Sequence, residues 1–243
     1  MAGTADPEEI ERFAAQSAGW WNPAGEFRPL HRLNPVRLGF IRRELLAHFA
    51  RDSSSLRPFE GLSLLDIGCG GGLIAEPMAR LGFRVTAIDA AEAAIAVARE
   101  HAEASGLKID YRVTTAEALA GEGASFDVVL ALELIEHVAD RDALFAAIGA
   151  LVAPRGAFIG ATINRTRRAF ALAIVGAEYI LGWLPRGTHD WRRFVRPSEF
   201  VLGLRRYGLQ ATRLAGVGYA PARGEWELGR DLSVNYMLMA ARG

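Results

Sequence analysis

The stretch LLDIGCGGG, residues 64–72, constrains the fold of this chain more than any other segment. Its first residues are apolar apart from Asp66, which is the pattern of a buried parallel strand that carries one functional carboxylate near its C-terminal end. Gly68 and the three glycines at 70–72 follow. Glycine adopts positive φ angles and lets the backbone approach a ligand closely. An apolar strand, a glycine-rich turn and a helix in this order predict a nucleotide-sized binding site.

This turn does not fit the dinucleotide-binding motif. Counted from Gly68, G-x-G-x-x-G would need a glycine where the chain has Leu73. The turn instead resembles the first motif of the class I S-adenosylmethionine (AdoMet)-dependent methyltransferases, an acidic residue followed by G-x-G-x-G, here Asp66, Gly68, Gly70 and Gly72. A strand-end carboxylate suits the ammonium group of AdoMet, and the glycines let the backbone pass close to it.

A second strand supports the same interpretation. RVTAID, residues 84–89, ends in Asp89, which stands 21 residues after Gly68. This is the spacing of a β–α–β unit, and a carboxylate at this place can accept hydrogen bonds from both ribose hydroxyls. The alternative interpretation is an ordinary glycine-rich turn, with Asp89 as the N-cap of the helix that follows.

Composition limits the number of domains, the class of partner and the cellular compartment that we expect for this chain. The 243 residues are 51% hydrophobic, which is enough to fill the core of a single α/β domain over residues 1–243. Lys+Arg and Asp+Glu are 28 each, so the charge balance disfavours nucleic acid as a partner. Cys69 is the only cysteine, and MAGTADPEEIERF has no apolar signal segment. We therefore expect a cytoplasmic protein.

Strands and helices alternate along the chain, which predicts a mostly parallel sheet with helices on both faces. Two N-terminal helices precede it within residues 1–50, one opening at Asp6 and the second at the N-cap Asn34 before Pro35. A helical insertion, residues 165–196, follows the fifth strand. The last two strands suggest an antiparallel hairpin at one sheet edge. The seven predicted strands lie near residues 63–67, 84–89, 109–114, 126–132, 157–163, 209–217 and 234–239.

The segment after the fourth strand, LELIEHV, carries the candidate chemistry for a methyl acceptor. If the chain turns helical after Leu132, then Glu133, Glu136 and His137 share one helix face at the C-terminal edge of the sheet. A phenolic hydroxyl must lose its proton when it is methylated. His137 is the best general-base candidate, because its unperturbed pKa is closest to neutral pH. The alternative is that the glutamates are solvated and the histidine is a capping or core residue.

Several further segments resemble one narrower family. LNPVRLGFI, EHV, INRTRR, VGAEYILGWLPRGTHDW and VNYM together look like the ubiquinone-biosynthesis O-methyltransferases, over nearly the whole chain from Trp20–Trp21 onward. The resemblance implies an α/β, class I methyltransferase Rossmann-like fold with a seven-stranded sheet. It also implies methylation of catechol hydroxyls on polyprenylated intermediates, namely 2-polyprenyl-6-hydroxyphenol and 3-demethylubiquinol.

The same resemblance assigns roles to particular residues. It implies that Arg37 grips the AdoMet carboxylate in a forked contact, where the alternative is a surface arginine on an amphipathic helix. Leu132, at a strand end, is expected to touch AdoMet. Glu133, Glu136 and His137 become candidate ligands for Mg²⁺, which would lower the pKa of the catechol oxygens.

The insertion predicts contact with a membrane. Residues 169–185 are apolar on nearly every helical face but are fewer than the roughly 20 that a bilayer span needs. Arginines stand on both sides, so we expect residues 165–193 to lie on an anionic membrane surface. This would make a cytoplasmic protein peripherally associated with the inner or plasma membrane, with other enzymes of ubiquinone biosynthesis as candidate partners. The alternatives are a lid over the site or a dimer contact.

Two other functions stay open at this point. One is methylation of another small phenolic acceptor. The other is a non-catalytic AdoMet-binding module that docks at a membrane and holds partner enzymes together, which would bind AdoMet without turnover.

Overall fold

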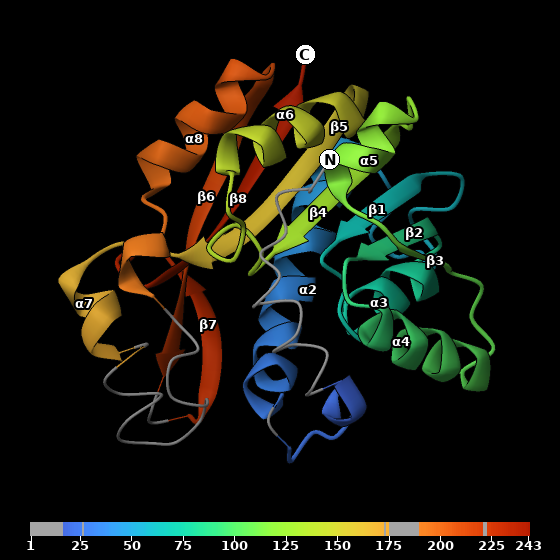
Figure 1. The fold of residues 1–243 in the computed structure, drawn as a ribbon, viewed down its shortest axis with the longest axis horizontal. Coiled ribbons are helices and arrows are strands. Elements are labelled where there is room, and N and C mark those ends of the chain that lie inside the picture. The colour runs from blue at the N-terminus through green and yellow to red at the C-terminus, as the bar shows by residue number, and fades with distance from the viewer. Residues whose placement is uncertain (1–16, 26, 173, 175–189, 221–222) are drawn as a thin grey trace.

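The computed structural model describes residues 17–25, 27–172, 174, 190–220 and 223–243. They form one eight-stranded sheet with helices on both faces, as Figure 1 shows. The strands are β1 (Ser63–Ile67), β2 (Arg84–Asp89), β3 (Asp110–Val113), β4 (Phe126–Leu132), β5 (Val152–Ile163), β6 (Leu209–Ala220), β7 (Glu225–Gly229) and β8 (Asn235–Arg242). The helices are η1 (Ser17–Gly19), α2 (Arg28–His48), α3 (Ala75–Arg80), α4 (Glu92–Ala104), α5 (Ala116–Gly121), α6 (Arg141–Leu151), α7 (Arg167–Ala169), η3 (Trp191–Arg193) and α8 (Pro197–Arg206).

The order of the strands fixes where a ligand can bind. The sheet runs β3-β2-β1-β4-β5-β8-β6-β7, and the pairs from β3 to β5 are all parallel. At the end of β1, Ile67 is paired with Ile88 of β2 on one side and with Ala131 of β4 on the other. The strand order reverses at β1, and open α/β sheets bind ligands beyond the carboxyl ends of strands at such a reversal.

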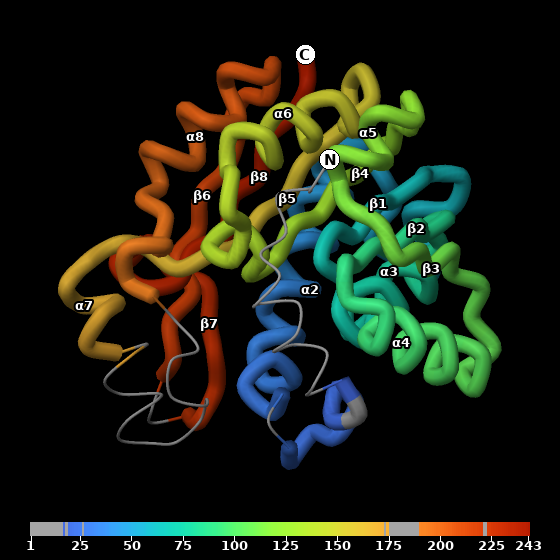
Figure 2. The backbone as a smooth tube through the Cα atoms, in the orientation of Figure 1, coloured from blue at the N-terminus to red at the C-terminus, as the bar shows by residue number. Residues whose placement is uncertain are grey.

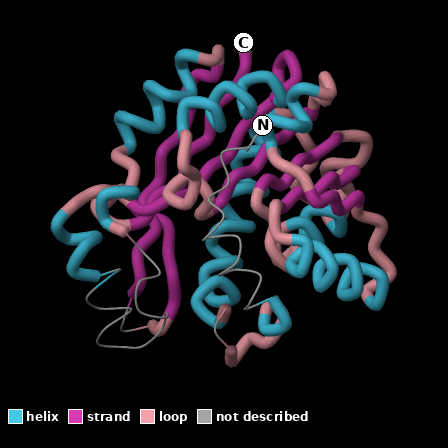
Figure 3. Tube along the Cα trace, viewed as in Figure 1, coloured by secondary structure: helices cyan, strands magenta, loops and turns pink. Residues whose placement is uncertain are grey.

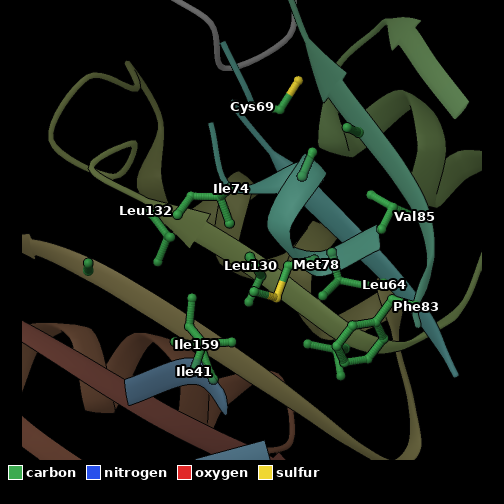
Figure 4. Close-up of a cluster of buried hydrophobic side chains, with 14 of the residues drawn as sticks. Ile41, Leu64, Cys69, Ile74, Met78, Phe83, Val85, Leu130, Leu132 and Ile159 are labelled. Carbon is green, nitrogen blue, oxygen red and sulfur yellow. The ribbon is translucent and has the colours of Figure 1, made fainter. Parts of the chain in front are cut away.

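Each face of the sheet buries its own set of helices, which Figure 3 shows as cyan coils around the magenta strands. One apolar cluster joins alternate strand residues to α2, α3 and α4, through side chains such as Phe40, Met78 and Ile95. Part of it is drawn in Figure 4. The other cluster joins the opposite face to α5, α6 and α8, through side chains such as Phe145 and Phe200. Buried strands covered on both sides explain the long apolar runs in the sequence.

The sheet has one strand more than the seven predicted. β7 is five residues long, EWELG, and it pairs antiparallel with β6 at the outer edge. Two of its residues are glutamates and three are exposed, so it lacks the apolar run that marks the inner strands. The last two predicted strands correspond to β6 and β8, which are antiparallel neighbours as expected. They do not form the edge, because β7 pairs with the outer side of β6.

The second N-terminal helix begins earlier than Asn34. α2 starts at Arg28, with Pro29 in its first turn, and continues through Pro35. The prediction that Asn34 is an N-cap is therefore wrong. Its side chain is buried and makes tertiary contacts instead, so packing against the rest of the protein outweighs the local stop signal of a proline.

Two predicted segments lie largely outside the described residues. The first N-terminal helix, expected from Asp6, is described only at η1, which contacts α4 and is drawn in blue in Figure 2. Most of the insertion 165–196 is likewise outside, although α7 and η3 are described at its two ends. Within the described part of the chain, no helix combines the length and the apolar character needed to cross a membrane.

Candidate active site

The glycine turn after β1 is held against β2 by its own backbone. Gly68, Gly70 and Gly72 have φ angles of +70°, +52° and +89°, which only glycine adopts without strain. The amide of Gly68 donates to the Ile88 carbonyl at 2.8 Å. The amide of Gly70 donates to the Asp89 carboxylate at 2.9 Å. The turn is thus fixed before any ligand arrives.

Neighbouring side chains leave no room for larger residues in this turn. A Cβ atom at Gly70 would lie 2.4 Å from the ring of Trp20, and one at Gly72 would lie 2.3 Å from the hydroxyl of Tyr111. Two of the glycines are therefore required by close packing as well as by their φ angles.

Asp66 lies one residue before the end of β1, in an environment that disfavours its charge. It is 3% exposed, and no described residue forms a hydrogen bond with its Oδ2 atom. Burial raises the pKa of Asp66 to about 7, against the lowering effect of Arg37 and with a smaller rise from Asp89. A cationic ligand beside Asp66 would therefore stabilise the ionised form of its carboxyl group.

Asp89 ends β2 and binds two backbone amides. Its Oδ2 accepts from Gly70, and its Oδ1 accepts from Ala91 at 2.9 Å. Burial raises the pKa of Asp89, and these amide hydrogen bonds act in the opposite direction. Ala91 occupies the N-cap position of α4, so Asp89 supports the start of that helix from two residues before it while also bracing the glycine turn.

Arg37 reaches the same edge of the sheet from α2. It is 4% exposed, so the alternative of a surface arginine is wrong. Its guanidinium pairs with Glu133 and donates to Asn34, while its Nε finds no acceptor within residues 17–25, 27–172, 174, 190–220 and 223–243. Asn34 in turn donates to the Leu73 carbonyl at 3.4 Å. The arginine therefore links the helix, the glycine turn and the segment after β4.

The segment after β4 is a turn, so the expected helix face is not formed. Glu133 has a φ of +50°, and its amide donates to the Ala161 carbonyl of β5 at 2.9 Å. The amide of His137 closes a turn on the Leu134 carbonyl at 2.9 Å. The positive φ at Glu133 prevents a helix from continuing out of the strand. Glu133, Glu136 and His137 consequently do not share one face.

Glu136 and His137 differ in burial. Glu136 is 3% exposed, accepts a 2.7 Å hydrogen bond from Thr162 and leaves its Oε1 atom without a partner. Burial raises its pKa, and the charge of His137 acts against this rise. The alternative of a solvated glutamate is therefore wrong for Glu136. His137 is partly buried, close enough for its charge to act on Glu136.

These donors do not fit a metal ion in their present positions. Glu133 is held by Arg37, and Glu136 is turned inward to Thr162. In the portion of the chain that the structure describes, no three His, Cys, Asp or Glu side chains gather in a way that could hold a metal ion. We derive no catalytic step through a metal.

Three residues at this edge were not found by sequence reasoning. Trp20 lies over the glycine turn, Asn34 bridges α2 to it, and Thr162 binds Glu136. The sequence did single out Asn34, but as a helix N-cap and not as a residue of this site. Thr162 sits inside an apolar strand, where its only signal is being the single hydroxyl in AFIGATI.

Comparisons with known proteins give the family. A methyltransferase domain model matches residues 65–160. The ubiquinone biosynthesis O-methyltransferase of Paramagnetospirillum magneticum is 56% identical over 99% of this chain and 96% of its own length. The one of Parvibaculum lavamentivorans is 54% identical over 98% and 94%. The chain belongs to the ubiquinone biosynthesis O-methyltransferases.

A solved structure agrees with the fold. The magnesium protoporphyrin IX methyltransferase from Synechocystis PCC 6803 with bound S-adenosylhomocysteine (AdoHcy) superposes with a TM-score of 0.67 at 18% identity, over 97% of this chain and all of the other. The predicted family, the Rossmann-like fold and the enzyme class, an AdoMet-dependent methyltransferase, are confirmed.

Proposed function

We propose that this protein transfers the methyl group of AdoMet to catechol-type hydroxyls of polyprenylated intermediates in ubiquinone biosynthesis, 2-polyprenyl-6-hydroxyphenol and 3-demethylubiquinol. One observation carries the proposal beyond the family membership. Three residues, Asp66, Arg37 and Glu136, each have a buried polar atom without a partner in the described part of the chain. They stand near the carboxyl ends of β1 and β4 and on the helix that faces them. Such atoms are costly to leave unsatisfied, and a polar ligand there would satisfy them.

The residues around the glycine turn match the parts of AdoMet. Asp66 faces the ammonium group and Arg37 the carboxylate, in a forked contact. Asp89 accepts from the ribose hydroxyls. Gly68 and Gly70 let the backbone approach the ligand, and Leu132, 9% exposed at the end of β4, contacts its apolar part. Leu132 belongs to the buried cluster of Figure 4, together with Cys69 of the turn.

Cofactor binding would change the partner of Arg37. In the structure the guanidinium is paired with Glu133. The AdoMet carboxylate would compete for the same nitrogen atoms and release Glu133. Glu133 stands at the start of the turn after β4, where the methyl acceptor would bind. Occupation of the cofactor site would in this way rearrange the acceptor site before the second substrate binds.

The transfer itself is an in-line displacement. The phenolic oxygen attacks the methyl carbon of AdoMet, the carbon–sulfur bond breaks with its electrons going to sulfur, and AdoHcy leaves. The phenolic proton passes to His137 as the general base. Glu136 is buried and lies close enough to His137 for the charge of the histidine to act on its carboxyl group.

The test is methyl transfer from labelled AdoMet to a prenylated catechol. We expect transfer by the wild type, and a loss of kcat of roughly 100- to 10,000-fold in His137→Ala with AdoMet affinity unchanged. Wild type that binds AdoMet but transfers nothing would indicate the non-catalytic module instead. Equal transfer with and without a chelator supports a base mechanism, whereas loss that Mg²⁺ restores would place a metal at the acceptor.

For the location, we propose that residues 165–193 contact an anionic membrane surface. The described flanks carry three exposed apolar side chains, Phe170, Leu172 and Trp191, next to the exposed cations Arg168 and Arg192. Apolar side chains beside arginines suit a headgroup interface.

Co-sedimentation with vesicles of anionic lipid tests the location. Phe170→Ser combined with Leu172→Ser should reduce the bound fraction. Leu56→Ser, which changes an exposed leucine elsewhere, is the matched control. Equal binding by the wild type and the double variant would exclude these side chains as the contact.

A further inference from the structure

The paired tryptophans lie on the glycine turn of the cofactor site. The ring of Trp20 packs along the backbone of Gly70 and Gly71, since a Cβ atom at either glycine would come within 2.5 Å of its side chain. Its other neighbour is Phe27, whose ring is stacked on it at 3.8 Å between centroids. Trp20 is 8% exposed. A large aromatic residue from the N-terminal segment thus covers the turn that receives AdoMet.

Contacts on both sides hold this residue in place. The carbonyl of Trp20 is hydrogen-bonded to the His31 ring at 2.8 Å. The next residue, Trp21, donates from its indole nitrogen to the Gly71 carbonyl at 2.9 Å and stacks on His101 at 3.4 Å. His101 is fixed by a 2.6 Å contact with the buried Glu76 of α3. The two tryptophans are therefore positioned, and of this pair only Trp21 donates its N–H group to another described residue.

The Nε1 atom of Trp20 is buried and has no hydrogen-bond partner among the residues that the structure describes. An indole N–H is a donor only, and a buried one normally finds an acceptor. A second buried donor without a partner, Nε of Arg37, belongs to the same surroundings. Arg37 binds Asn34, Asn34 binds the Leu73 carbonyl, and Leu73 packs in one apolar cluster with Trp20.

The unsatisfied groups match the two charges of an amino acid. Trp20 and Arg37 offer donors, and Asp66, close enough to Arg37 for the two charges to interact, offers an acceptor. A carboxylate satisfies the donors, and an ammonium group satisfies the acceptor. AdoMet carries both at its methionyl end.

We propose that the indole Nε1–H of Trp20 donates a hydrogen bond to the carboxylate of bound AdoMet, beside the guanidinium of Arg37. The proposal rests on the cofactor assignment made above. It gives the N-terminal segment a direct part in binding, so that Trp20 both covers the glycine turn and recognises the methionyl end of the ligand.

Three ligands separate this role from simple packing. AdoMet and AdoHcy carry the carboxylate, whereas 5′-methylthioadenosine keeps the adenosine and the sulfur but lacks the amino acid end. Trp20→Phe preserves an aromatic ring and removes the N–H. It should weaken calorimetrically measured binding of AdoMet and AdoHcy by roughly 10- to 100-fold and leave 5′-methylthioadenosine unchanged. Equal weakening of all three ligands, or of none, would overturn the proposal.

Trp21→Phe is the matched control. It removes the N–H that supports the turn at Gly71, so its effect should be the same for all three ligands. A second measurement uses the wild type alone, so it does not depend on whether a variant folds. Among the five indole N–H signals in a ¹⁵N NMR spectrum, that of Trp20 should shift with AdoHcy and stay in place with 5′-methylthioadenosine. A Trp20 signal that responds identically to both would contradict the proposal.

The two assignments can fail separately. A wild-type protein that binds neither AdoMet nor AdoHcy would end the cofactor assignment itself. A wild type that binds both, together with an unaffected Trp20→Phe, would remove only the role of Trp20.

Discussion

The glycine turn after β1 and the acidic turn after β4 lie at the same edge of the sheet but are stabilised differently. The glycine turn is held by backbone amides bound to β2, through the Ile88 carbonyl and the Asp89 carboxylate. The acidic turn is also bound to the sheet by one backbone amide, that of Glu133 on the Ala161 carbonyl of β5, but the Glu133 side chain at its start is held by an ion pair with Arg37. A ligand can displace a side-chain ion pair far more easily than it can displace the hydrogen bonds that hold a backbone turn. The fold therefore presets the cofactor side, whereas on the acceptor side the Glu133 side chain can exchange its partner.

The strongest test of this contrast is to disturb the preset side. Gly70→Ala places a methyl group against the Trp20 ring at a residue whose φ is +52°. The turn must shift, and we expect AdoMet affinity to fall by roughly 100-fold, because small displacements in a positioned site have large effects. Isothermal titration calorimetry measures this directly.

Gly106→Ala is the control for the strain at positive φ alone. Gly106 ends α4 with a φ of +66°, and nothing lies within 4 Å of an added Cβ. It should lose about 1 kcal/mol of folding free energy and keep its affinity for AdoMet. If Gly70→Ala bound AdoMet as tightly as Gly106→Ala does, the turn would be adaptable and the contrast would disappear.

A smaller effect should come from the protonation of Asp66. Its pKa of about 7 in the free protein means that an ammonium ligand must displace a proton at lower pH. We expect binding of AdoMet to be about tenfold weaker at about pH 6 than at about pH 8. Titration calorimetry in buffers of different ionisation enthalpy should also detect the released proton. Any pH dependence of AdoMet binding that remains in Asp66→Asn comes from the ligand and from other groups of the protein.

The same shift has a consequence for stability. Because the pKa of Asp66 is raised on folding, protonation favours the folded free protein. This contribution is full below about pH 4 and is lost as pH rises through about 7. Asp66→Asn should flatten that part of the stability curve in urea unfolding. An unchanged slope between these pH values would mean that Asp66 is ionised in the free protein.

The contrast also explains what the sequence could predict. The glycine turn is local in sequence, and its strand, glycines and acids were all visible in LLDIGCGGG and RVTAID. Glu133 and Arg37 are 96 residues apart, so no local pattern could pair them. LELIEH has helical spacing, but hydrogen bonding of Glu133 to β5 imposes a turn there. Trp20 contacts a turn 50 residues further along the chain, so no local sequence pattern could predict this contact either.

The smallest expected effect tests the exchange of partners on Arg37. In Glu133→Gln the buried guanidinium loses its anionic partner in the free protein, whereas in the complex the AdoMet carboxylate would supply one. The free state is thus destabilised more than the bound state, and AdoMet should bind about fivefold more tightly. Its melting temperature should rise more on adding AdoMet than that of the wild type does.

Glu44→Gln removes an ion pair on the same helix, between neighbours Arg43 and Glu44, and should leave both quantities unchanged. Weaker binding in Glu133→Gln would mean that Glu133 holds Arg37 in position for the cofactor instead of competing with it. Both turns would then be preset, since the pair at the acceptor turn would be part of the cofactor site. Acceptor binding in the absence of AdoMet should in that case equal binding in its presence, whereas exchange at Arg37 requires AdoMet to bind first.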